Sequence, residues 1–330
     1  MLLASDAPLA RVAAELCAAR GSYVSGERLA QALGLSRNAV WKHVLRLRRL
    51  GYEVESSRRL GHRLVAPSGR PFPWEVAQAL RTRSIGRAYR YFDRIPSTQD
   101  AARAWAAAGA PDGAAVLAEE QSAGRGRRGA AFAAPRGGLW CSVVLRPRRP
   151  AAEAPVLAML GAAAAAAALV RLGAPGVSLW WPKDVLIGGR KAGGVLAEVA
   201  ADQDEIGEAI LGIGLNLNLR AEDFPPAVRD RAGSLLLATG REVPLASAAA
   251  VLFEELEALA DAYRAEGPPA VARAWRAFPG LEGRRVCVQT PNGELRGLAL
   301  GIDDSGGLRL ASPGGERVVP AGIVIPAEER

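Results

Sequence analysis

The sequence predicts an α+β protein made of three parts. Apolar residues recur at helical spacing through residues 8–50, and a short alternating segment follows them. Helical and alternating patterns then intermingle as far as Gly280. From Arg284 to Ile325 only short alternating strands remain, separated by glycine-rich turns. This order favours a small helical domain, a central mixed sheet with helices, and a terminal β domain.

The first part of the sequence predicts helices followed by a β-hairpin. Pro8–Ala19 carries apolar residues on one helical face, and Ser25 and Ser36 are placed to cap two further helices on either side of a glycine turn. The segment YEVESSRRLGHRLV then alternates on both sides of a basic tip. Helix, turn, helix and hairpin together predict a winged helix-turn-helix over residues 1–67.

The last helix of this domain, Arg37–Leu50, has a polar and basic outer face. In such domains this helix reads base edges in the major groove, while the wing and the helix ends contact phosphates. Winged helices also serve as protein-binding modules, but the basic helix and wing favour DNA. The candidate DNA contacts are Arg37, Asn38, Trp41, Lys42, Arg58 and Arg59.

The proline- and glycine-rich segment Pro67–Pro73 predicts a linker, so the central domain is expected over residues 68–280. After a strand at Ala88–Phe92, the run Pro96-Ser97-Thr98 opens an alanine-rich helix, whose N-terminus suits an anion or a polar ligand head. Further strands are expected at Ala114–Glu119, Leu139–Leu145, Val177–Trp181 and Ala209–Leu219, with a hairpin between the last two, and helices at Leu157–Leu172, Leu245–Tyr263 and Pro269–Phe278.

The loop Gln121–Gly129 reads QSAGRGRRG and joins two of these strands. Its glycines allow the backbone to approach a ligand closely, and its three arginines supply planar groups that keep their charge. Phosphate or carboxylate is the expected ligand. Gly/Arg-rich loops are also found as solvated basic surface or as RNA-binding tails. The loop alone therefore does not distinguish an anion-binding site from these two interpretations.

Composition sets limits on the rest. The chain is 49% hydrophobic with a net charge of +8, which suits a globular protein with a polyanionic partner. Its three cysteines are far apart and lack metal-ligand spacing, so neither disulfides nor fixed metal ligands are expected. No signal-like segment opens the chain, and the longest apolar run, Gly161–Val170, is too short to span a bilayer. We expect a cytoplasmic protein with no membrane partner.

Several motifs occur in an order that resembles the bifunctional biotin protein ligases, which also repress the biotin operon. They are SRNAVWKHVLRLRRLGYEV in the winged helix, Ser97-Thr98, QSAGRGRRG, Trp181-Pro182 with Asp184, GRKAGGVL, GIGLNLN and Gly301-Ile302-Asp303. The resemblance runs over nearly the whole length. It implies a class-II-synthetase-like mixed sheet, followed by an SH3-like β-barrel over residues 281–330, where the strand pattern itself predicts a small barrel.

Members of that family use ATP to activate biotin as biotinyl-5′-adenylate and pass biotin to one lysine of a biotin carboxyl carrier protein. The resemblance therefore implies ATP, Mg²⁺ and biotin as ligands, and operator DNA and an adenylate-dependent homodimer as partners. It implies catalytic roles for Lys191, Arg127 and Asp184. The implied biotin-binding residues are Ser97, Thr98, Gln99, Gln121, Arg125, Gly126, Arg127, Lys191, Gly194 and Leu196, and the implied ATP and adenylate residues are Arg127, Arg128, Lys183, Gly212, Gly214 and Asn216.

The chain departs from the family pattern in three places. The family's Lys-Trp-Pro-Asn-Asp reads Trp180-Trp181-Pro182-Lys183-Asp184 here, so one lysine is lost and another stands three positions later. Adjacent residues of a strand face opposite sides, so this lysine replaces the lost charge only if the local backbone turns it inward. Ala130 occupies a position where the family commonly has Arg or Lys, and Phe132 one where it commonly has Trp. Gln99 occupies a position where Asn is frequent.

Three alternatives stay open at this point. The altered segment permits a repressor that senses biotin or adenylate without turnover. A ligase with a vestigial DNA-binding domain is also compatible with the sequence. Lipoate and octanoate transferases share the central core, but the Gly/Arg loop together with a winged helix and a terminal β domain resembles the biotin branch.

Overall fold

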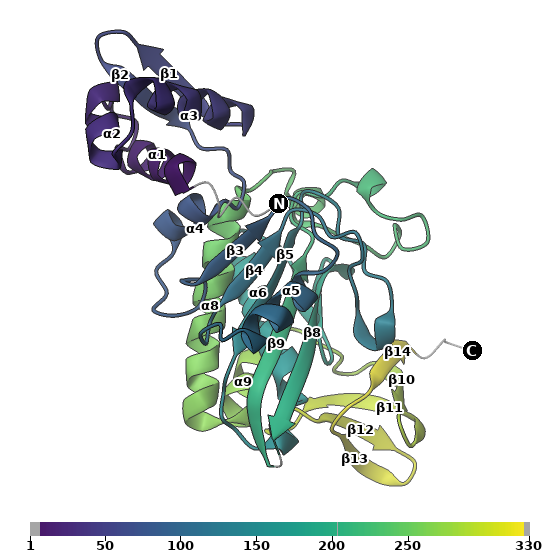
Figure 1. Cartoon of the computed structure of the whole chain (residues 1–330). Coiled ribbons are helices and arrows are strands. Elements are labelled where there is room, and N and C mark those ends of the chain that lie inside the picture. Colours follow the sequence, from purple (N-terminus) through teal and green to yellow (C-terminus); the bar gives the residue numbers. More distant parts are fainter. Residues whose placement is uncertain (1–6, 203, 327–330) are drawn as a thin grey trace.

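The computed structural model describes residues 7–202 and 204–326, and Figure 1 shows a helical domain at one end, a sheet with helices in the middle and a second sheet at the other end. The helical domain contains α1 (Ala7–Ala18), α2 (Gly26–Leu33), α3 (Arg37–Arg49), β1 (Glu53–Ser57) and β2 (Gly61–Ala66). Ser25 and Ser36 cap α2 and α3, accepting backbone N–H bonds of 3.0 and 3.1 Å. The predicted helix-turn-helix and wing are confirmed.

The linker packs tightly against both neighbouring domains. Phe72 stacks on Trp74 at 4.9 Å between ring centroids, and it contacts Tyr52 of the helical domain and Tyr91 of the central sheet at 6.0 and 5.1 Å. All four rings belong to the buried core of the N-terminal domain. This aromatic contact, together with α4 (Pro73–Ala79), fixes the helical domain against the central sheet.

The central sheet is mixed and has seven strands in the order β3-β4-β5-β9-β8-β7-β6. Only β3 and β4 run parallel among these pairs, and the other neighbours are antiparallel. The strands are β3 (Tyr89–Phe92), β4 (Ala115–Ala118), β5 (Leu139–Leu145), β6 (Val177–Trp180), β7 (Asp184–Ile187), β8 (Arg190–Asp202) and β9 (Glu205–Leu215).

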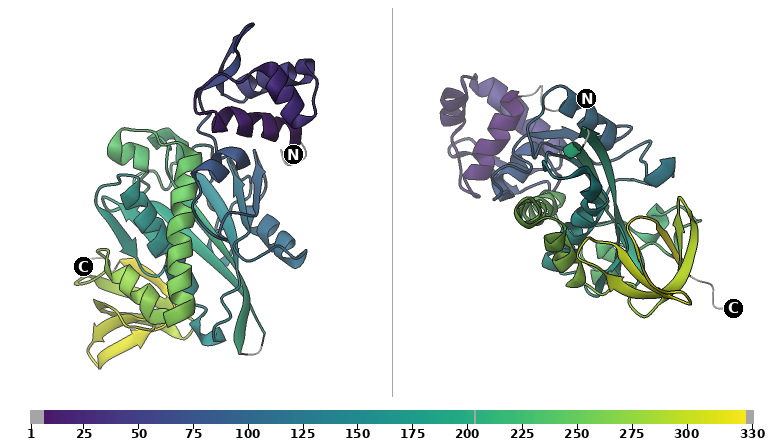
Figure 2. Two further views of the ribbon diagram at one scale, coloured as in Figure 1. Left: turned by 90° about the vertical axis from the view of Figure 1, so that its left-hand side faces the viewer. Right: turned by 90° about the horizontal axis from the view of Figure 1, so that it is seen from below.

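Helices cover both faces of this sheet. On one face α6 (Val156–Arg171) packs against β6, β8 and β9, and α8 (Leu245–Glu266) and α9 (Pro268–Arg276) pack on α6 (Figure 2). A Cβ at Gly161 would lie 2.9 Å from Val195, so the glycine allows α6 to approach β8 closely. On the other face α5 (Thr98–Ala107) lies on β4, β5 and β9. The short elements are α7 (Leu235–Thr239) and the 3₁₀ turns η2 (Arg127–Gly129), η3 (Ala151–Glu153) and η4 (Ala221–Asp223).

The C-terminal part is an open antiparallel sheet in the order β13-β12-β11-β10-β14. The expected closed barrel is therefore wrong: within residues 7–202 and 204–326, β13 and β14 are edges that do not pair. The apolar face needs no closure, because it is buried in the same core as the central helices. The strands are β10 (Arg285–Thr290), β11 (Gly293–Ile302), β12 (Leu308–Ser312), β13 (Gly315–Val319) and β14 (Ile323–Pro326).

No helix in the part of the chain that the structure describes is long and apolar enough to cross a membrane.

Candidate active site

A cavity of about 240 Å³ opens between the start of α5, the Gly/Arg loop and strands β5, β8 and β9. The sequence-predicted residues converge here although they are spread over more than a hundred positions. The predicted residues that line the cavity are Ser97, Thr98, Gln99, Gln121, Arg125, Gly126, Arg127, Lys183, Lys191, Gly194, Leu196, Gly212 and Gly214.

One end of the cavity is a buried cluster of hydroxyl and amide groups. Thr98 Oγ1 lies 2.9 Å from Ser142 Oγ, and its backbone N–H donates to Gln121 Oε1 at 2.8 Å. Ser142 Oγ donates to Gln99 Oε1 at 3.0 Å, and Gln99 Nε2 donates to the Ile210 carbonyl at 2.9 Å. Such a cluster offers donors and acceptors in fixed positions to a small polar ring.

Ser142 was missed by the sequence reasoning. It is fully buried in β5, whose seven residues are all buried and otherwise read as a core strand. A single hydroxyl inside the apolar run LWCSVVL was the available signal, because a buried polar group needs partners. Ser97, which also lines the cavity, caps α5 by accepting a bond from the Asp100 N–H, and this places the helix N-terminus at the cavity.

The glycines of GIGLN make room for side chains from other elements. A Cβ at Gly212 would lie 2.5 Å from Gln99 Oε1, and a Cβ at Gly214 would lie 2.9 Å from the ring of Phe132. Any side chain at either position would displace the polar cluster or the aromatic wall. These two glycines are therefore required by the shape of the cavity.

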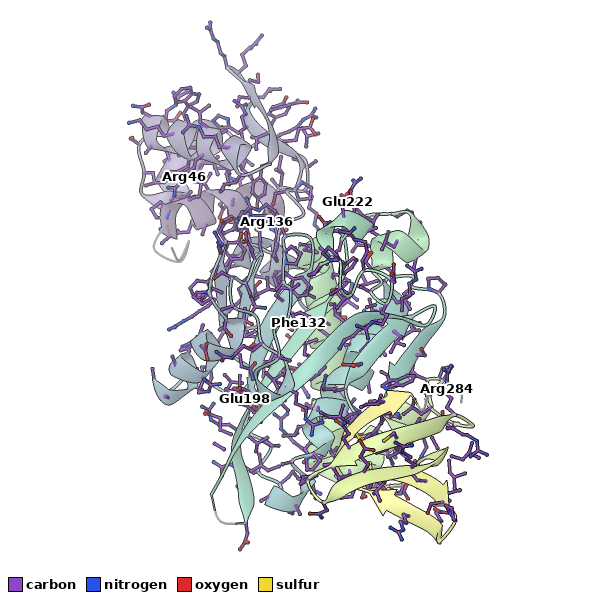
Figure 3. All side chains as sticks on the ribbon, turned by 90° about the vertical axis from the view of Figure 1, so that its right-hand side faces the viewer. Arg46, Phe132, Arg136, Glu198, Glu222 and Arg284 are labelled. Atoms are coloured by element: carbon purple, nitrogen blue, oxygen red, sulfur yellow. The ribbon has the colours of Figure 1, made fainter. Side chains whose placement is uncertain are left out.

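Phe132 forms a wall between this cavity and a second one. Its ring meets Trp140 edge to face, with centroids 5.6 Å apart and planes at 81°, and Trp140 Nε1 donates to the Pro135 carbonyl at 2.8 Å. Figure 3 labels Phe132 over the middle of the central sheet. The sequence reasoning noted Phe132 only as a departure from the family, and the structure brings it into the site.

The Gly/Arg loop is held by its own backbone and by two of its arginines. Gly126 N–H donates to the Ala130 carbonyl at 2.7 Å. Arg125 forms a two-bond ion pair with Asp100, and this pair lowers the pKa of the carboxyl. Arg127 donates at 2.6 Å to the carbonyl of Gly322 in the C-terminal part. The side chain of Arg128 lies outside the described residues.

Two lysines share one carboxylate at the charged end of the cavity. Asp184 Oδ1 accepts from Lys183 Nζ at 2.9 Å and from Lys191 Nζ at 2.8 Å. Burial alone would raise the pKa of Asp184, but the charges of Lys191 and Lys183 outweigh burial and hold that pKa below its ordinary value. One carboxylate and two ammonium groups leave a net positive charge that can receive an anion.

Lys183 reaches the cavity because it does not lie in a strand. It occupies the turn between β6 and β7, where its N–H donates to the Trp180 carbonyl at 3.1 Å and its carbonyl accepts from Val195 N–H at 3.1 Å. The rule that neighbouring strand residues face opposite sides therefore does not apply. The lysine displaced along the sequence is brought to the same cavity as Lys191.

Asn216 lies in the second cavity, which has a volume of about 610 Å³ and shares Phe132 and Lys191 with the first. Its side-chain amide donates to the Gly233 carbonyl at 2.9 Å and to the Lys191 carbonyl at 3.3 Å. The predicted ATP residues are thus divided between the two cavities. The sequence reasoning did not anticipate Trp180, Arg190, Phe224 and Arg231 in the second one.

The predicted DNA contacts lie in the helical domain at one end of the molecule and are all exposed. Arg37, Asn38, Trp41 and Lys42 are on the outer face of α3, while Val40 and Val44 of the same helix are buried. Trp41 is 48% exposed, a high value for so large an apolar side chain. Arg58 and Arg59 lie at the tip of the β1–β2 hairpin.

A metal site made by the protein alone is not found: among residues 7–202 and 204–326, no three His, Cys, Asp or Glu side chains are grouped to hold an ion.

Comparison with known proteins identifies all three parts. Residues 91–216 match the biotin/lipoate A/B protein ligase family, residues 9–63 match a helix-turn-helix domain, and residues 283–325 match the biotin protein ligase C-terminal domain. In its fold the chain is similar to the biotin protein ligase from Aquifex aeolicus in complex with biotin and ATP, with a TM-score of 0.64, 24% identity, and coverage of 72% of this chain and 98% of that one.

Curated relatives extend over nearly the whole chain. The bifunctional ligase/repressor BirA of Bacillus spizizenii is 37% identical, with coverage of 91% of this chain and 93% of the relative. The protein of the same name from Bacillus subtilis is 36% identical, with coverage of 88% and 90%. This chain therefore belongs to the biotin protein ligase family, among its bifunctional ligase/repressor members.

Proposed function

We propose that this protein uses ATP to convert biotin into biotinyl-5′-AMP, transfers biotin to a specific lysine of a biotin carboxyl carrier protein, and represses the biotin operon with biotinyl-5′-AMP as corepressor. The observation that carries the proposal is the polarity of the 240 Å³ cavity. One end offers neutral hydrogen-bonding groups and the other offers Lys183, Lys191 and Arg127. Biotin has the matching polarity, with a ureido ring at one end and a carboxylate at the other.

The ureido ring binds at the buried polar cluster. Thr98, Gln121 and Ser142 supply oxygen atoms for its N–H groups and a hydroxyl for its carbonyl, Gln99 bonds Ser142, and Ser97 adds a hydroxyl from the helix N-terminus. Gly194 and Leu196 of β8 line the tail. Arg125 and Gly126 close the loop over the carboxylate, and Arg125 gives up its pairing with Asp100 to do so.

In the first step a biotin carboxylate oxygen attacks the α-phosphorus of ATP, and the bond from that phosphorus to the pyrophosphate breaks. Two anions must approach, so the barrier depends on fixed positive charge. Lys191 stabilises the charge that develops on the transferring phosphoryl group, with Arg127 and Lys183 beside it. Asp184 holds both lysines in place. In the second step the carrier lysine attacks the biotinyl carbonyl carbon, and AMP leaves.

The second cavity accepts the nucleotide, because it is larger and opens beside Lys191. Asn216 borders it directly, whereas Gly212 and Gly214 line the first cavity. Mg²⁺ is usually bound by substrate phosphates with one or two carboxylates, and Asp184 is a carboxylate in a suitable place. When bound, Mg²⁺ neutralises phosphate charge.

The winged helix is proposed to bind operator DNA as part of an adenylate-dependent homodimer in the cytoplasm. Exposure of Arg37, Lys42 and the wing arginines supports DNA contact. We propose residues 1–67, 68–280 and 281–330 as the DNA-binding, catalytic and C-terminal units. The central sheet is proposed to be class-II-synthetase-like, and the C-terminal strands to follow an SH3-like order in which β13 and β14 do not pair.

A catalytically impaired sensor-repressor is the second candidate, suggested by the lost lysine at position 180. The place of Lys183 favours the active enzyme. The deciding experiment is pyrophosphate release after mixing the protein with biotin, ATP and Mg²⁺, with lipoate in parallel. Biotin-dependent release supports the ligase, and tight biotin binding without release supports the sensor. Adenylate-dependent binding to two-fold symmetric DNA separates a repressor from a ligase with a vestigial winged helix.

A further inference from the structure

A cluster of two carboxylates and two arginines lies outside the cavity, between the Gly/Arg loop and the linker. Glu119 Oε1 accepts from Arg70 Nε at 2.6 Å, and Glu119 Oε2 accepts from Arg136 Nη1 at 2.6 Å. Asp93 bridges the same two arginines at 2.8 and 2.6 Å. Tyr91 OH also donates to Glu119. Each arginine therefore contacts both carboxylates, and Arg136 Nε also lies 3.8 Å from Glu120 Oε2.

Two members of the cluster form the base of the Gly/Arg loop. Glu119 directly follows β4 and Arg136 shortly precedes β5, so their ion pair joins the two chain segments that lead into and out of the loop. The backbone adds one bond at this place, from Gln121 N–H to the Ala134 carbonyl at 3.0 Å. Figure 3 labels Arg136 where the central sheet meets the winged helix.

The third member belongs to the linker. The Arg70 guanidinium lies over the ring of Phe72, 4.7 Å from its centroid, and Phe72 is part of the aromatic contact with Tyr52 of the winged helix. One carboxylate thus holds both the base of the loop and the linker. The side chain of Glu119 is only 9% exposed, so removal of one of these partners would leave a buried carboxylate oxygen without a donor.

We propose that Glu119 is a positioning residue that sets the closed geometry of the Gly/Arg loop and ties it, through Arg70, to the linker of the winged helix. The inference rests on the proposed function, in which this loop is the lid over biotin and its adenylate. Asp93 aligns the two guanidinium groups so that both meet Glu119. Closing of the lid then changes the position of the linker, and movement of the linker changes the rate at which the adenylate dissociates.

The test compares Glu119→Gln and Arg70→Lys with Arg146→Gln as a matched control. Arg146 is a half-buried arginine at 28% side-chain exposure against 29% for Arg70, and it is paired with Glu208 at 2.7 Å far from the loop. A lysine at position 70 keeps the charge but lacks the planar guanidinium through which Arg70 bonds both carboxylates at fixed geometry. The rate of biotinyl-5′-AMP dissociation and the kcat and KM for biotin are measured for each protein.

We expect dissociation to be about 10-fold faster in Glu119→Gln and in Arg70→Lys, equivalent to about 1.4 kcal/mol, with a raised KM for biotin and a kcat within about twofold. Arg146→Gln should behave as the wild type. Wild-type dissociation in Arg70→Lys overturns the link to the linker, and wild-type dissociation in Glu119→Gln overturns the positioning role. If Glu119→Gln does not fold, Arg136→Lys takes its place, since it also loses one of two bridges at the loop base.

A second readout needs no turnover. Trypsin cuts after the loop arginines, and biotin should slow these cuts in the wild type and in Arg146→Gln. Faster cleavage without biotin is expected in Glu119→Gln and Arg70→Lys, and unchanged cleavage counts against the inference. A wild-type protein that releases no pyrophosphate would instead reject the proposed enzyme, so the two failures are distinguishable.

Discussion

Removal of the Lys183 ammonium tests whether the displaced lysine restores the charge that the family has at another position. In the structure Lys183 and Lys191 both donate to the same oxygen of Asp184. In Lys183→Ala, Asp184 remains paired with Lys191, and the local charge at the end of the cavity falls from +1 to zero. The transferring phosphoryl group then meets a neutral pair in place of a net cation.

The size of the effect follows from Coulomb's law. A full charge about 4 Å from the ammonium interacts by about 4 kcal/mol at an effective dielectric constant of about 20. If about half a charge develops in the transition state, the loss is about 2 kcal/mol, or roughly 30-fold in the rate of adenylate formation. Lys183→Arg should keep most of the rate because it keeps the charge.

The assay is single-turnover pyrophosphate release at saturating biotin and ATP, with biotin affinity measured separately. Lys183→Ala should also bind biotin more weakly, because this lysine lies at the end of the cavity that receives the biotin carboxylate, and saturating biotin removes that contribution from the measured rate. An unchanged rate in Lys183→Ala would refute the reasoning. Equal losses in Lys183→Ala and Lys183→Arg would show that the position matters and the charge does not.

Other predictions concern single contacts. Gly212→Ala should raise the KM for biotin at least about 10-fold and leave that for ATP unchanged, since its Cβ would lie 2.5 Å from Gln99 Oε1; equal effects on both substrates would contradict this. Arg127→Ala should speed adenylate dissociation through loss of the bond to Gly322, and normal off-rates would argue against it. Lys42→Ala should weaken operator binding and reduce the salt slope by about 1, which titration at several salt concentrations checks. Burial alone would raise the pKa of Glu257, but the N–H groups of residues 83–85 lower it to about 2. The ionised carboxylate therefore stabilises the folded protein fully above about pH 4.5, and this contribution is lost as the pH falls toward 2. Glu257→Gln should remove this part of the pH dependence of the unfolding free energy, which urea titrations at several pH values measure.

The sequence predicted the structure correctly where the role of a residue depends only on its near neighbours in the chain. Ser25 and Ser36 cap helices because a short hydroxyl side chain can reach a backbone N–H, and this depends on a few neighbouring residues only. The Gly/Arg loop was recognisable for the same reason. The arrangement of the C-terminal strands was not, because whether β13 meets β14 depends on where the apolar face is buried, and that is decided by the central helices.

One site residue from within a core strand, Ser142, was missed from the sequence. It stands among apolar residues in a fully buried strand, and its role depends on Thr98 and Gln99, which are more than forty positions away. Asn216 was predicted beside the nucleotide, and only the strand register decides that it borders the second cavity. Motifs report which residues are present, while the register of β5, β8 and β9 determines which of them face the same space.

The exchange of lysine for tryptophan at position 180 has a structural consequence beyond Lys183. Trp180 lines the second cavity, and the Arg284 guanidinium lies 5.8 Å from the centroid of its ring. The C-terminal part thus adds a positive charge beside Trp180, in addition to Arg190, Lys191 and Arg231 of the cavity itself. The same part accepts bonds from Trp181 Nε1 at Gly306 and from Arg127 at Gly322. Both the Gly/Arg loop and Trp181, which directly follows β6, therefore bond to the C-terminal part. Removal of residues 281–330 should impair adenylate formation itself as well as carrier recognition. Single-turnover adenylation by a truncated protein that stays folded would decide between these roles.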